Sequence, residues 1–245
     1  MSHREFYLST VTYKVTAGVA TITLNRPKQI NAFNIEMRDD LYTILELYRD
    51  DQNALSAVLC GSGDKGFCSG ADLSEFGKAP SQIIARSVRW ERDLWGLFLS
   101  LRKPIVVALH GYVVGSGVEI SSLCDVRIAA ENTTFRMPEA ALGLLPAAGG
   151  TQMIPRLIGQ KRAMKMLLMG EEIDVQEARK SCLIDRIVPN EALMEESLQA
   201  ATELTYIASS KIAIVKELVR KGLDLPADRA LDLERMVGIK AHFTK

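Results

Sequence analysis

The chain has 245 residues, of which 47% are hydrophobic, and its 30 Lys and Arg residues balance 30 Asp and Glu residues. This length fits one large domain or a domain with a small appendage, and the hydrophobic content suffices for a full core, which excludes a disordered chain. A formal net charge of zero lacks the basic surplus of a nucleic-acid binder, so nucleic acid is not an expected partner.

The first half of the chain alternates predicted strands with predicted helices. Residues 11–15 and 19–24 alternate apolar and polar side chains around Ala17-Gly18, which predicts a β-hairpin at the edge of a sheet. Apolar spacing over residues 37–48 predicts an amphipathic helix. Short apolar runs predict strands at 57–60, 105–109, 126–129 and 133–135, and longer stretches predict helices at 83–101 and 117–123. This alternation is typical of an α/β fold with a largely parallel core.

After Thr151 the pattern becomes helical, with predicted helices at residues 161–168, 175–180, 191–206 and 212–221. Val188-Pro189 predicts a boundary, which divides the chain into a core of residues 1–189 and a C-terminal helical region of residues 190–245. Because the second region shows no core of its own, we expect it to pack on the main domain or on a neighbouring subunit. An oligomer is therefore the expected state.

The four cysteines, Cys60, Cys68, Cys124 and Cys182, are widely spaced and form no CxxC pair. This spacing predicts neither a metal site nor a disulfide framework, so we expect four reduced thiols packed as small apolar side chains. The N-terminus lacks the apolar run of a signal peptide, and no window has the roughly 20 apolar residues of a membrane span. A cytoplasmic protein that does not bind membranes is expected.

Two glutamates, Glu119 and Glu139, lie in mostly apolar stretches, the first just after Gly115-Ser116-Gly117. Desolvating a carboxylate is costly, so each needs a partner or a chemical role. Taken alone, Glu119 is better explained as a structural carboxylate bonded to backbone N–H groups. Together, two such groups beside a turn of small residues can form an acid/base pair next to an oxyanion pocket, an arrangement suited to acyl thioesters.

Two glycine-rich turns, residues 66–73 and 115–117, each follow a predicted strand. Backbone N–H groups in such turns can hold an enolate oxygen, because glycine lets the chain approach a ligand closely. The second turn also opens a helix, whose N-terminus favours negative charge. Most turns of this kind are only tight connections. A dinucleotide site is excluded, because Ile120 stands where that motif needs its third glycine.

Four separated segments, in the same order, resemble the signature of the enoyl-CoA hydratase/isomerase, or crotonase, superfamily: residues 25–32, 66–74, 103–125 and 135–152. The resemblance covers roughly residues 11–189 and is weaker in the last helices. It implies a spiral of repeated β-β-α units and a C-terminal helical region that assembles homotrimers or dimers of trimers (hexamers). The tail after the last helix is shorter than the family's usual tail.

The resemblance also implies residue roles. The N–H groups of Ala71 and Ser116 would form the oxyanion hole, and Ser116, where many relatives have glycine, would narrow or re-polarise the pocket. Glu119 would orient and activate a water, and Glu139 would handle the proton on the α-carbon. The segment expected to line the coenzyme A cleft, beside Ser116, is Ala71-Asp72-Leu73-Ser74.

The implied activity is hydration of a trans-2-enoyl-CoA to a 3-hydroxyacyl-CoA, or the reverse, as in fatty acid metabolism. Double-bond isomerisation is the alternative, although Glu119 argues against it because many isomerases of the family keep only the later glutamate. Decarboxylation of a malonyl-type thioester is a third reading, and the acyl group can also be carried on an acyl carrier protein. Zero net charge and the glutamate pair disfavour an RNA-binding or scaffold role. No cofactor is expected, since coenzyme A belongs to the substrate.

Other polar residues receive structural interpretations. Asp72 is predicted to cap a helix N-terminus, Asp125 to anchor backbone hydrogen bonds, and His110 to be a satisfied structural histidine. Nothing near Cys68 in the sequence would lower its pKa, so a nucleophilic role is not expected. Arg136 is expected to be a solvated side chain, with contact to a polar acyl group as the alternative.

Overall fold

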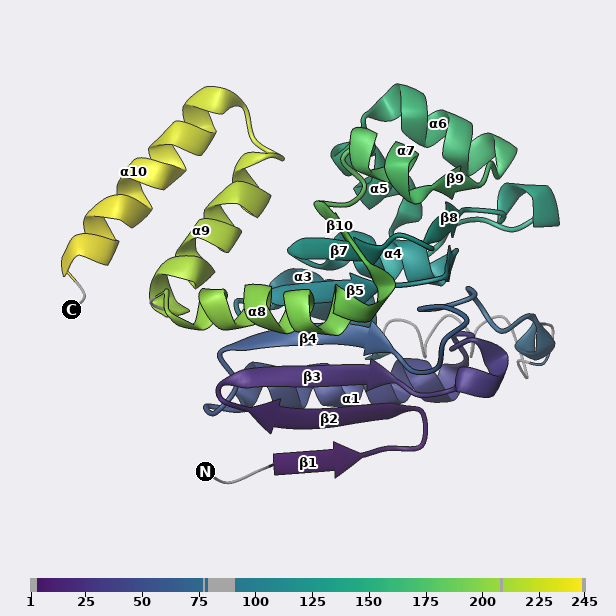
Figure 1. Ribbon diagram of the computed structural model, residues 1–245. Coiled ribbons are helices and arrows are strands. Elements are labelled where there is room, and N and C mark those ends of the chain that lie inside the picture. The colour runs from purple at the N-terminus through teal and green to yellow at the C-terminus, as the bar shows by residue number, and fades with distance from the viewer. Residues whose placement is uncertain (1–3, 77, 79–90, 208, 244–245) are drawn as a thin grey trace.

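The computed structural model describes residues 4–76, 78, 91–207 and 209–243 (Figure 1). In this part of the chain, two sheets share one hydrophobic body. The larger has seven strands in the order β1 (Arg4–Tyr7), β2 (Val11–Thr16), β3 (Val19–Leu24), β4 (Ser56–Gly61), β5 (Ile105–Leu109), β7 (Val126–Ala130) and β10 (Arg186–Val188). The smaller has the order β6 (Tyr112–Val114), β8 (Thr134–Arg136) and β9 (Ile173–Asp174). From β3 to β10 the larger sheet is parallel, as predicted.

The predicted hairpin is confirmed, but it does not lie at the sheet edge. β2 and β3 pair antiparallel around Ala17 and Gly18, both of which have positive φ. The edge strand is β1, which pairs antiparallel with β2. Its sequence, Arg4-Glu5-Phe6-Tyr7, has no alternating apolar pattern and leaves Tyr7 exposed, so it gives no strand signal.

The helices among the described residues are α1 (Ile35–Asp50), α3 (Leu94–Ser100), α4 (Ser116–Leu123), α5 (Gly150–Ile158), α6 (Gln160–Met169), α7 (Val175–Lys180), α8 (Leu193–Thr205), α9 (Ser209–Gly222) and α10 (Ala227–Phe243). One helix was predicted over residues 83–101, and this is wrong for the residues that the structure describes. The Asp93 side chain accepts the Gly96 N–H and caps the N-terminus of a separate helix, α3. Residues 83–90 lie outside the described residues. Sequence patterns do not predict α5, since it contains Pro155 and begins at a glycine pair.

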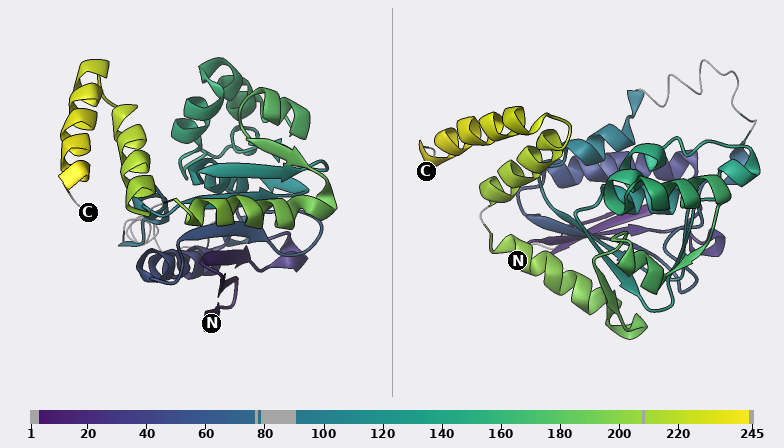
Figure 2. Two further views of the ribbon diagram at one scale, coloured as in Figure 1. Left: turned by 60° about the vertical axis from the view of Figure 1, so that its left-hand side comes forward. Right: turned by 90° about the horizontal axis from the view of Figure 1, so that it is seen from above.

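The large sheet is buried on both faces. On one side, α1, α3 and α4 pack over residues such as Leu59 and Val107, and on the other α8 packs over Val58 and Val106 (Figures 1 and 2). Side chains of successive strand residues point to opposite faces, so the continuous apolar runs of β4 and β5 serve both layers. The C-terminal region therefore begins, in α8, as a cover of the sheet. The helical hairpin α9–α10 instead stands beside the body (Figure 2).

Of the four cysteines, which are all free thiols, Cys60, Cys68 and Cys124 are buried as expected. Cys182 is exposed, contrary to the prediction, because it occupies a turn with a φ of 66° after α7 rather than a packed element. No helix in the described ranges combines the length and apolarity needed to cross a bilayer.

Candidate active site

The loop after β4 runs parallel to β6 and brings the two glycine-rich turns together. The Cys68 N–H donates to the Tyr112 carbonyl at 3.1 Å, and the Val114 N–H donates to the Cys68 carbonyl at 2.9 Å. Cys68 thus pairs with Val113 in a parallel register. Three residues further along each segment stand Ala71 and Ser116. The two turns stay close there, since a Cβ on Gly115 would lie 3.6 Å from the Gly70 Cα atom.

The main-chain amides of Ala71 and Ser116 have no hydrogen-bond acceptor among the described residues. On either side of Ala71, the Phe33 N–H donates to the Gly70 carbonyl (2.8 Å) and the Asp72 N–H donates to the Phe33 carbonyl (3.0 Å). These two bonds do not use the Ala71 N–H. Ser116 is the first residue of α4, whose N–H has no partner within the helix. Two adjacent donors of this kind can bind one oxygen that gains negative charge.

Glu119 lies in the first turn of α4 and is only 2% exposed. Its Oε1 atom accepts the N–H groups of Ala148 and Gly150, both at 3.0 Å. A Cβ on Gly150 would lie 2.9 Å from that oxygen, so the contact requires glycine there. These bonds match the structural interpretation of Glu119, and they also fix the orientation of its carboxylate.

Glu139 precedes the short 3-10 helix η3 (Ala140–Leu142) and reaches the same end of α4. A Cβ on Gly115 would lie 2.5 Å from its Oε1 atom, so only glycine admits the carboxylate. Its Oε2 atom is buried and has no hydrogen-bond partner in the described structure. Burial raises the pKa of Glu139 above the ordinary value of 4.5, so the group keeps its proton to higher pH than a solvated glutamate.

The predicted coenzyme-binding segment is organised by Asp72. This residue caps the 3-10 helix η2 (Leu73–Glu75), where its Oδ1 atom accepts the Ser74 N–H (3.1 Å) and the Ser74 hydroxyl (2.7 Å). Its Oδ2 atom binds the Arg26 guanidinium at 3.0 Å. The bonds from Ser74, and then Arg26, lower the pKa of Asp72. The predicted capping role is confirmed, while Leu73 beside it is exposed.

Sequence reasoning passed over Asn31, which supports the same turn. This fully buried side chain donates from Nδ2 to the carbonyls of Ser62 (3.0 Å), Gly66 (3.2 Å) and Phe67 (3.0 Å), and its Oδ1 atom accepts the Arg26 N–H at 2.9 Å. Asn31 could have been noticed because it lies in the segment 25–32. That segment was used only as one of the four motifs of the family resemblance. Asn31 and Arg26 together hold the loop that presents the Ala71 amide.

The remaining polar candidates lie outside this group. Asp125 accepts the Ile105 N–H at 2.8 Å, which confirms its anchoring role. His110 is hydrogen-bonded through Nε2 to the Gly63 carbonyl at 2.8 Å, and burial lowers its pKa. Burial raises the pKa of Cys68 to about 12, which disfavours the thiolate. Arg136 is exposed, as expected, but its Nε–H also donates to the Gly170 carbonyl at 2.9 Å.

Comparison with known proteins identifies the fold and the family. A model of the enoyl-CoA hydratase/isomerase family matches residues 14–244. The chain therefore belongs to the enoyl-CoA hydratase/isomerase, or crotonase, family. The crystal structure of an enoyl-CoA hydratase from Bacillus anthracis superposes with a TM-score of 0.91 at 31% identity, covering 97% of this chain and 92% of that one. The crotonase fold predicted for the chain is confirmed.

Relatives in this family carry names of hydratases. A probable mitochondrial enoyl-CoA hydratase of Dictyostelium discoideum is 33% identical over 235 residues, covering 95% of this chain and 82% of that protein. An (E)-benzylidenesuccinyl-CoA hydratase of Thauera aromatica is 35% identical, covering 90% of this chain and 86% of that protein. The names agree on hydration of a coenzyme A thioester but differ in the acyl group.

Proposed function

We propose that the chain is an enoyl-CoA hydratase that interconverts a trans-2-enoyl-CoA and a 3-hydroxyacyl-CoA. The observation that carries the proposal is the grouping at the N-terminal end of α4. The amides of Ala71 and Ser116, which have no acceptor in the described part of the chain, lie there with two glutamates that reach the same turn. The family implies an acyl-CoA substrate, and the segment from Ala71 to Ser74 would line its cleft.

In the proposed reaction the thioester oxygen accepts hydrogen bonds from the Ala71 and Ser116 N–H groups. Water adds through its oxygen to the β-carbon while Glu119, as the carboxylate, takes the departing proton. The electron pair of the C=C bond moves towards the carbonyl, and the resulting enolate is held by the two amides. Glu139, in its protonated form, then gives its proton to the α-carbon.

The raised pKa of Glu139 supports this division of roles. Burial of its carboxyl raises the pKa, so Glu139 keeps the proton to be transferred up to a higher pH than a solvated glutamate does. The Glu119 Oε1 atom is fixed by two main-chain amides, which sets the orientation of the carboxylate that would activate the water. The N-terminus of α4 adds favourable partial charge at the developing enolate.

Isomerisation is the second candidate, and the environment of Glu139 is what favours it. A buried carboxyl with one oxygen unpartnered is able to move a proton between two carbons of an acyl chain by itself. In that reaction Glu119 would remain structural, as its bonds to Ala148 and Gly150 permit. Substrate assays distinguish the two reactions.

The proposal is tested by spectroscopic hydration of crotonyl-CoA and longer enoyl-CoAs, with Glu119→Gln and Glu139→Gln beside the wild type. Each variant keeps the size of the side chain but cannot exchange a proton, so turnover should fall at least about 100-fold. Near-wild-type turnover in one variant removes that residue from the mechanism. Isomerisation of a 3-enoyl-CoA without any hydration would establish the second candidate instead.

A further inference from the structure

Helix α4 is buried along its whole length, and its two ends have different surroundings. Every residue from Ser116 to Leu123 is buried. The N-terminal end faces the candidate active site, where the Ser116 N–H has no acceptor among the described residues. The last turn of a buried helix also leaves carbonyl groups without helical partners, and these must be satisfied within the protein. At the C-terminal end the Ser121 carbonyl accepts the Cys124 N–H at 3.2 Å, and the carbonyls of Leu123 and Cys124 are bound by cations.

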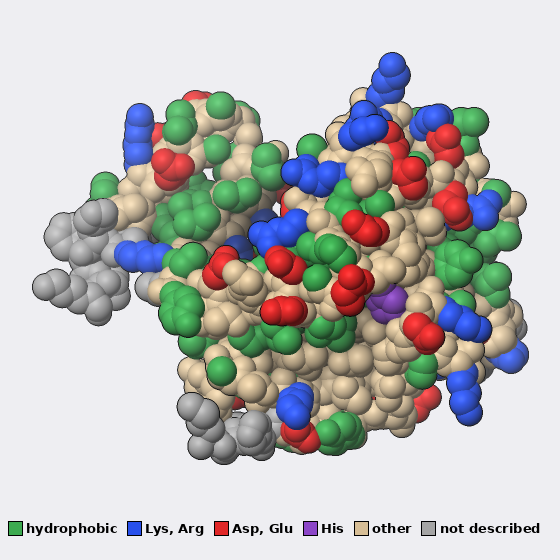
Figure 3. Space-filling model, viewed as in Figure 1, with side chains coloured by type: hydrophobic (Ala, Val, Ile, Leu, Met, Phe, Trp, Pro, Cys, Tyr) green, Lys and Arg blue, Asp and Glu red, His purple; other side chains and the backbone are tan. Residues whose placement is uncertain are grey.

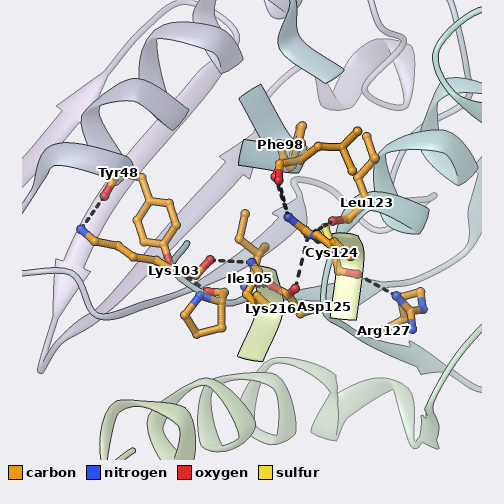
Figure 4. A network of polar contacts seen from close by, with 12 residues as sticks. Tyr48, Phe98, Lys103, Ile105, Leu123, Cys124, Asp125, Arg127 and Lys216 are labelled. Atoms are coloured by element: carbon orange, nitrogen blue, oxygen red, sulfur yellow. Dashed lines mark hydrogen bonds and ion pairs between the residues drawn. The ribbon is translucent and has the colours of Figure 1, made fainter. Parts of the chain in front are cut away.

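One of these cations follows α4 closely in the sequence, and the others lie on α9, about 90 residues later (Figure 4). The Arg127 Nη1 atom donates to the Cys124 carbonyl at 2.7 Å, and the Arg220 Nη2 atom donates to the Leu123 carbonyl at 3.4 Å. Asp125, the next residue, accepts the Ile105 N–H at 2.8 Å and forms an ion pair with Lys216 at 2.7 Å. The chain leaving α4 is thus tied to β5 and, through Lys216 and Arg220, to α9.

Lys216 and Arg220 also bind the body beyond Asp125. Lys216 donates to the Lys103 carbonyl at 2.9 Å, just before β5, and Arg220 donates to the Leu99 carbonyl at 2.6 Å in the last turn of α3. The Lys216 side chain is only 12% exposed and that of Asp125 20%, so this ion pair is largely shielded from water. A shielded pair depends strongly on both partners being present.

Apolar packing contributes little to the attachment of α9. Among residues 211–222 only Ala213 is buried. A cavity of about 320 Å³ is lined by residues 99–102 at the end of α3 and by residues of α9. Figure 3 shows basic side chains in the indentation beside the α9–α10 hairpin. A further ion pair joins Arg156 to Asp224 at 3.1 Å, but both side chains are well exposed. Among the described residues, the contacts of Lys216 and Arg220 are therefore the best-shielded polar contacts between α9 and the body.

We propose that Lys216 and Arg220 are positioning residues: by binding Asp125 and the C-terminal end of α4, they hold the helix that presents the Ser116 N–H and Glu119. An eight-residue helix is about 12 Å long and moves as a rigid unit, so a displacement of its C-terminal end also displaces its N-terminal end. Cations at its C-terminus also stabilise the helix dipole whose positive end faces the enolate. The catalytic part of this inference rests on the proposed hydratase function.

The experiment compares Lys216→Met with Lys221→Met. Lys221 lies on the same helix but is exposed, and among the described residues its ion pair is with Glu217, at 2.6 Å. Hydrogen exchange is followed by mass spectrometry in peptides covering residues 115–125, and kcat and KM are measured with crotonyl-CoA. In Lys216→Met we expect exchange at least about tenfold faster in these peptides and kcat about tenfold lower, because small misplacements of reacting groups are costly. KM should change less than about twofold.

Lys221→Met should leave both readouts at their wild-type values, and Lys216→Arg, which keeps the charge, should restore part of kcat. If Lys216→Met does not yield folded protein, Arg220→Met is measured in the same way. Its contacts with Leu123 (3.4 Å) and Asp125 (3.5 Å) are longer than that of Lys216 with Asp125, so we expect a smaller effect on α4, and the variant also loses the 2.6 Å bond to the Leu99 carbonyl.

Unchanged exchange in residues 115–125 would overturn the inference, because α9 would then not hold α4. Faster exchange with an unchanged kcat would overturn the positioning role, as would a loss confined to KM. A wild-type protein without hydratase activity would refute the proposed function instead, and the exchange measurement would still decide whether α9 holds α4.

Discussion

At the scale of single residues, the candidate site depends on small side chains that let two carboxylates approach one helix end. Gly115 has a φ of 49° and lies against Glu139, while Gly150 lies against Glu119. A sequence shows such glycines only as a turn signal. Which carboxylate each of them admits depends on contacts between residues far apart in the chain.

Gly115→Ala should displace Glu139, because the new Cβ would lie 2.5 Å from its Oε1 atom. We expect hydratase turnover to fall at least about 100-fold and stability to fall by about 1–2 kcal/mol from the positive φ. Gly143→Ala is a matched control, since Gly143 also has a positive φ, 70°, but a Cβ there meets nothing within 4 Å. The control should share the stability loss and keep its activity. Equal turnover in both variants would contradict the role of this contact.

The raised pKa of Glu139 predicts a pH dependence of stability. The folded protein holds this proton more tightly than the unfolded chain, whose glutamate has the ordinary value of 4.5. Stability should therefore fall as pH rises from that value through the folded-state pKa, and then level off. Glu139→Gln cannot ionise and should lack the fall. Urea unfolding from about pH 4 to about pH 8 measures it, and a difference between the two proteins that stays constant with pH would refute the assignment.

At the scale of elements, local sequence patterns predicted the helices and strands that are long enough to carry a period. The hairpin β2–β3, the buried strands β4 and β5, and α1 were predicted for this reason. Strands β1, β6, β9 and β10 have two to four residues and show no usable period. Helix α5 was missed because Pro155 and the preceding glycines are ordinarily signs of a helix end.

The buried Asn31 side chain makes several of the hydrogen bonds that hold the loop between β4 and η2, so this loop should be sensitive to its loss. Asn31→Ala would leave three carbonyl groups and the Arg26 N–H without their partner. We expect a loss of at least about 2 kcal/mol in the free energy of unfolding, from unsatisfied buried groups. Gln52→Ala, at an exposed position where the side chain donates to the Asp50 carbonyl at 3.3 Å, should cost less than about 0.5 kcal/mol in the same denaturation experiment. Equal losses of unfolding free energy in the two variants would show that the hydrogen bonds of Asn31 do not stabilise this loop.

At the scale of the whole molecule, the α9–α10 hairpin carries apolar side chains that nothing in the described structure covers. Figure 3 shows hydrophobic side chains gathered on it, and the exposed ones include Val215, Val219, Leu231, Met236 and Ile239. Exposed apolar surface of this extent marks an interaction site. We propose that it forms part of the interface of a homotrimer or of a dimer of trimers, as the family resemblance implied.

Sedimentation of the wild-type protein should give three or six times the mass of one chain. Val219→Asp and Ile239→Asp place a charge on exposed apolar positions, 55% and 63% exposed, and should shift the protein to smaller species. Arg229→Gln, on the exposed surface of α10, should keep the wild-type mass. A monomeric wild-type protein would refute the proposal.

The family, the parallel α/β core and the two glutamates could all be predicted from the amino-acid sequence, because each rests on local patterns or on motifs in a recognisable order. The folded structure was needed to show that the amides of Ala71 and Ser116 lie near each other, with no acceptor among the residues it describes, and that Lys216 reaches Asp125 from a distant part of the chain. Hydrogen-bond satisfaction and burial depend on contacts between distant residues, and no sequence period encodes such contacts.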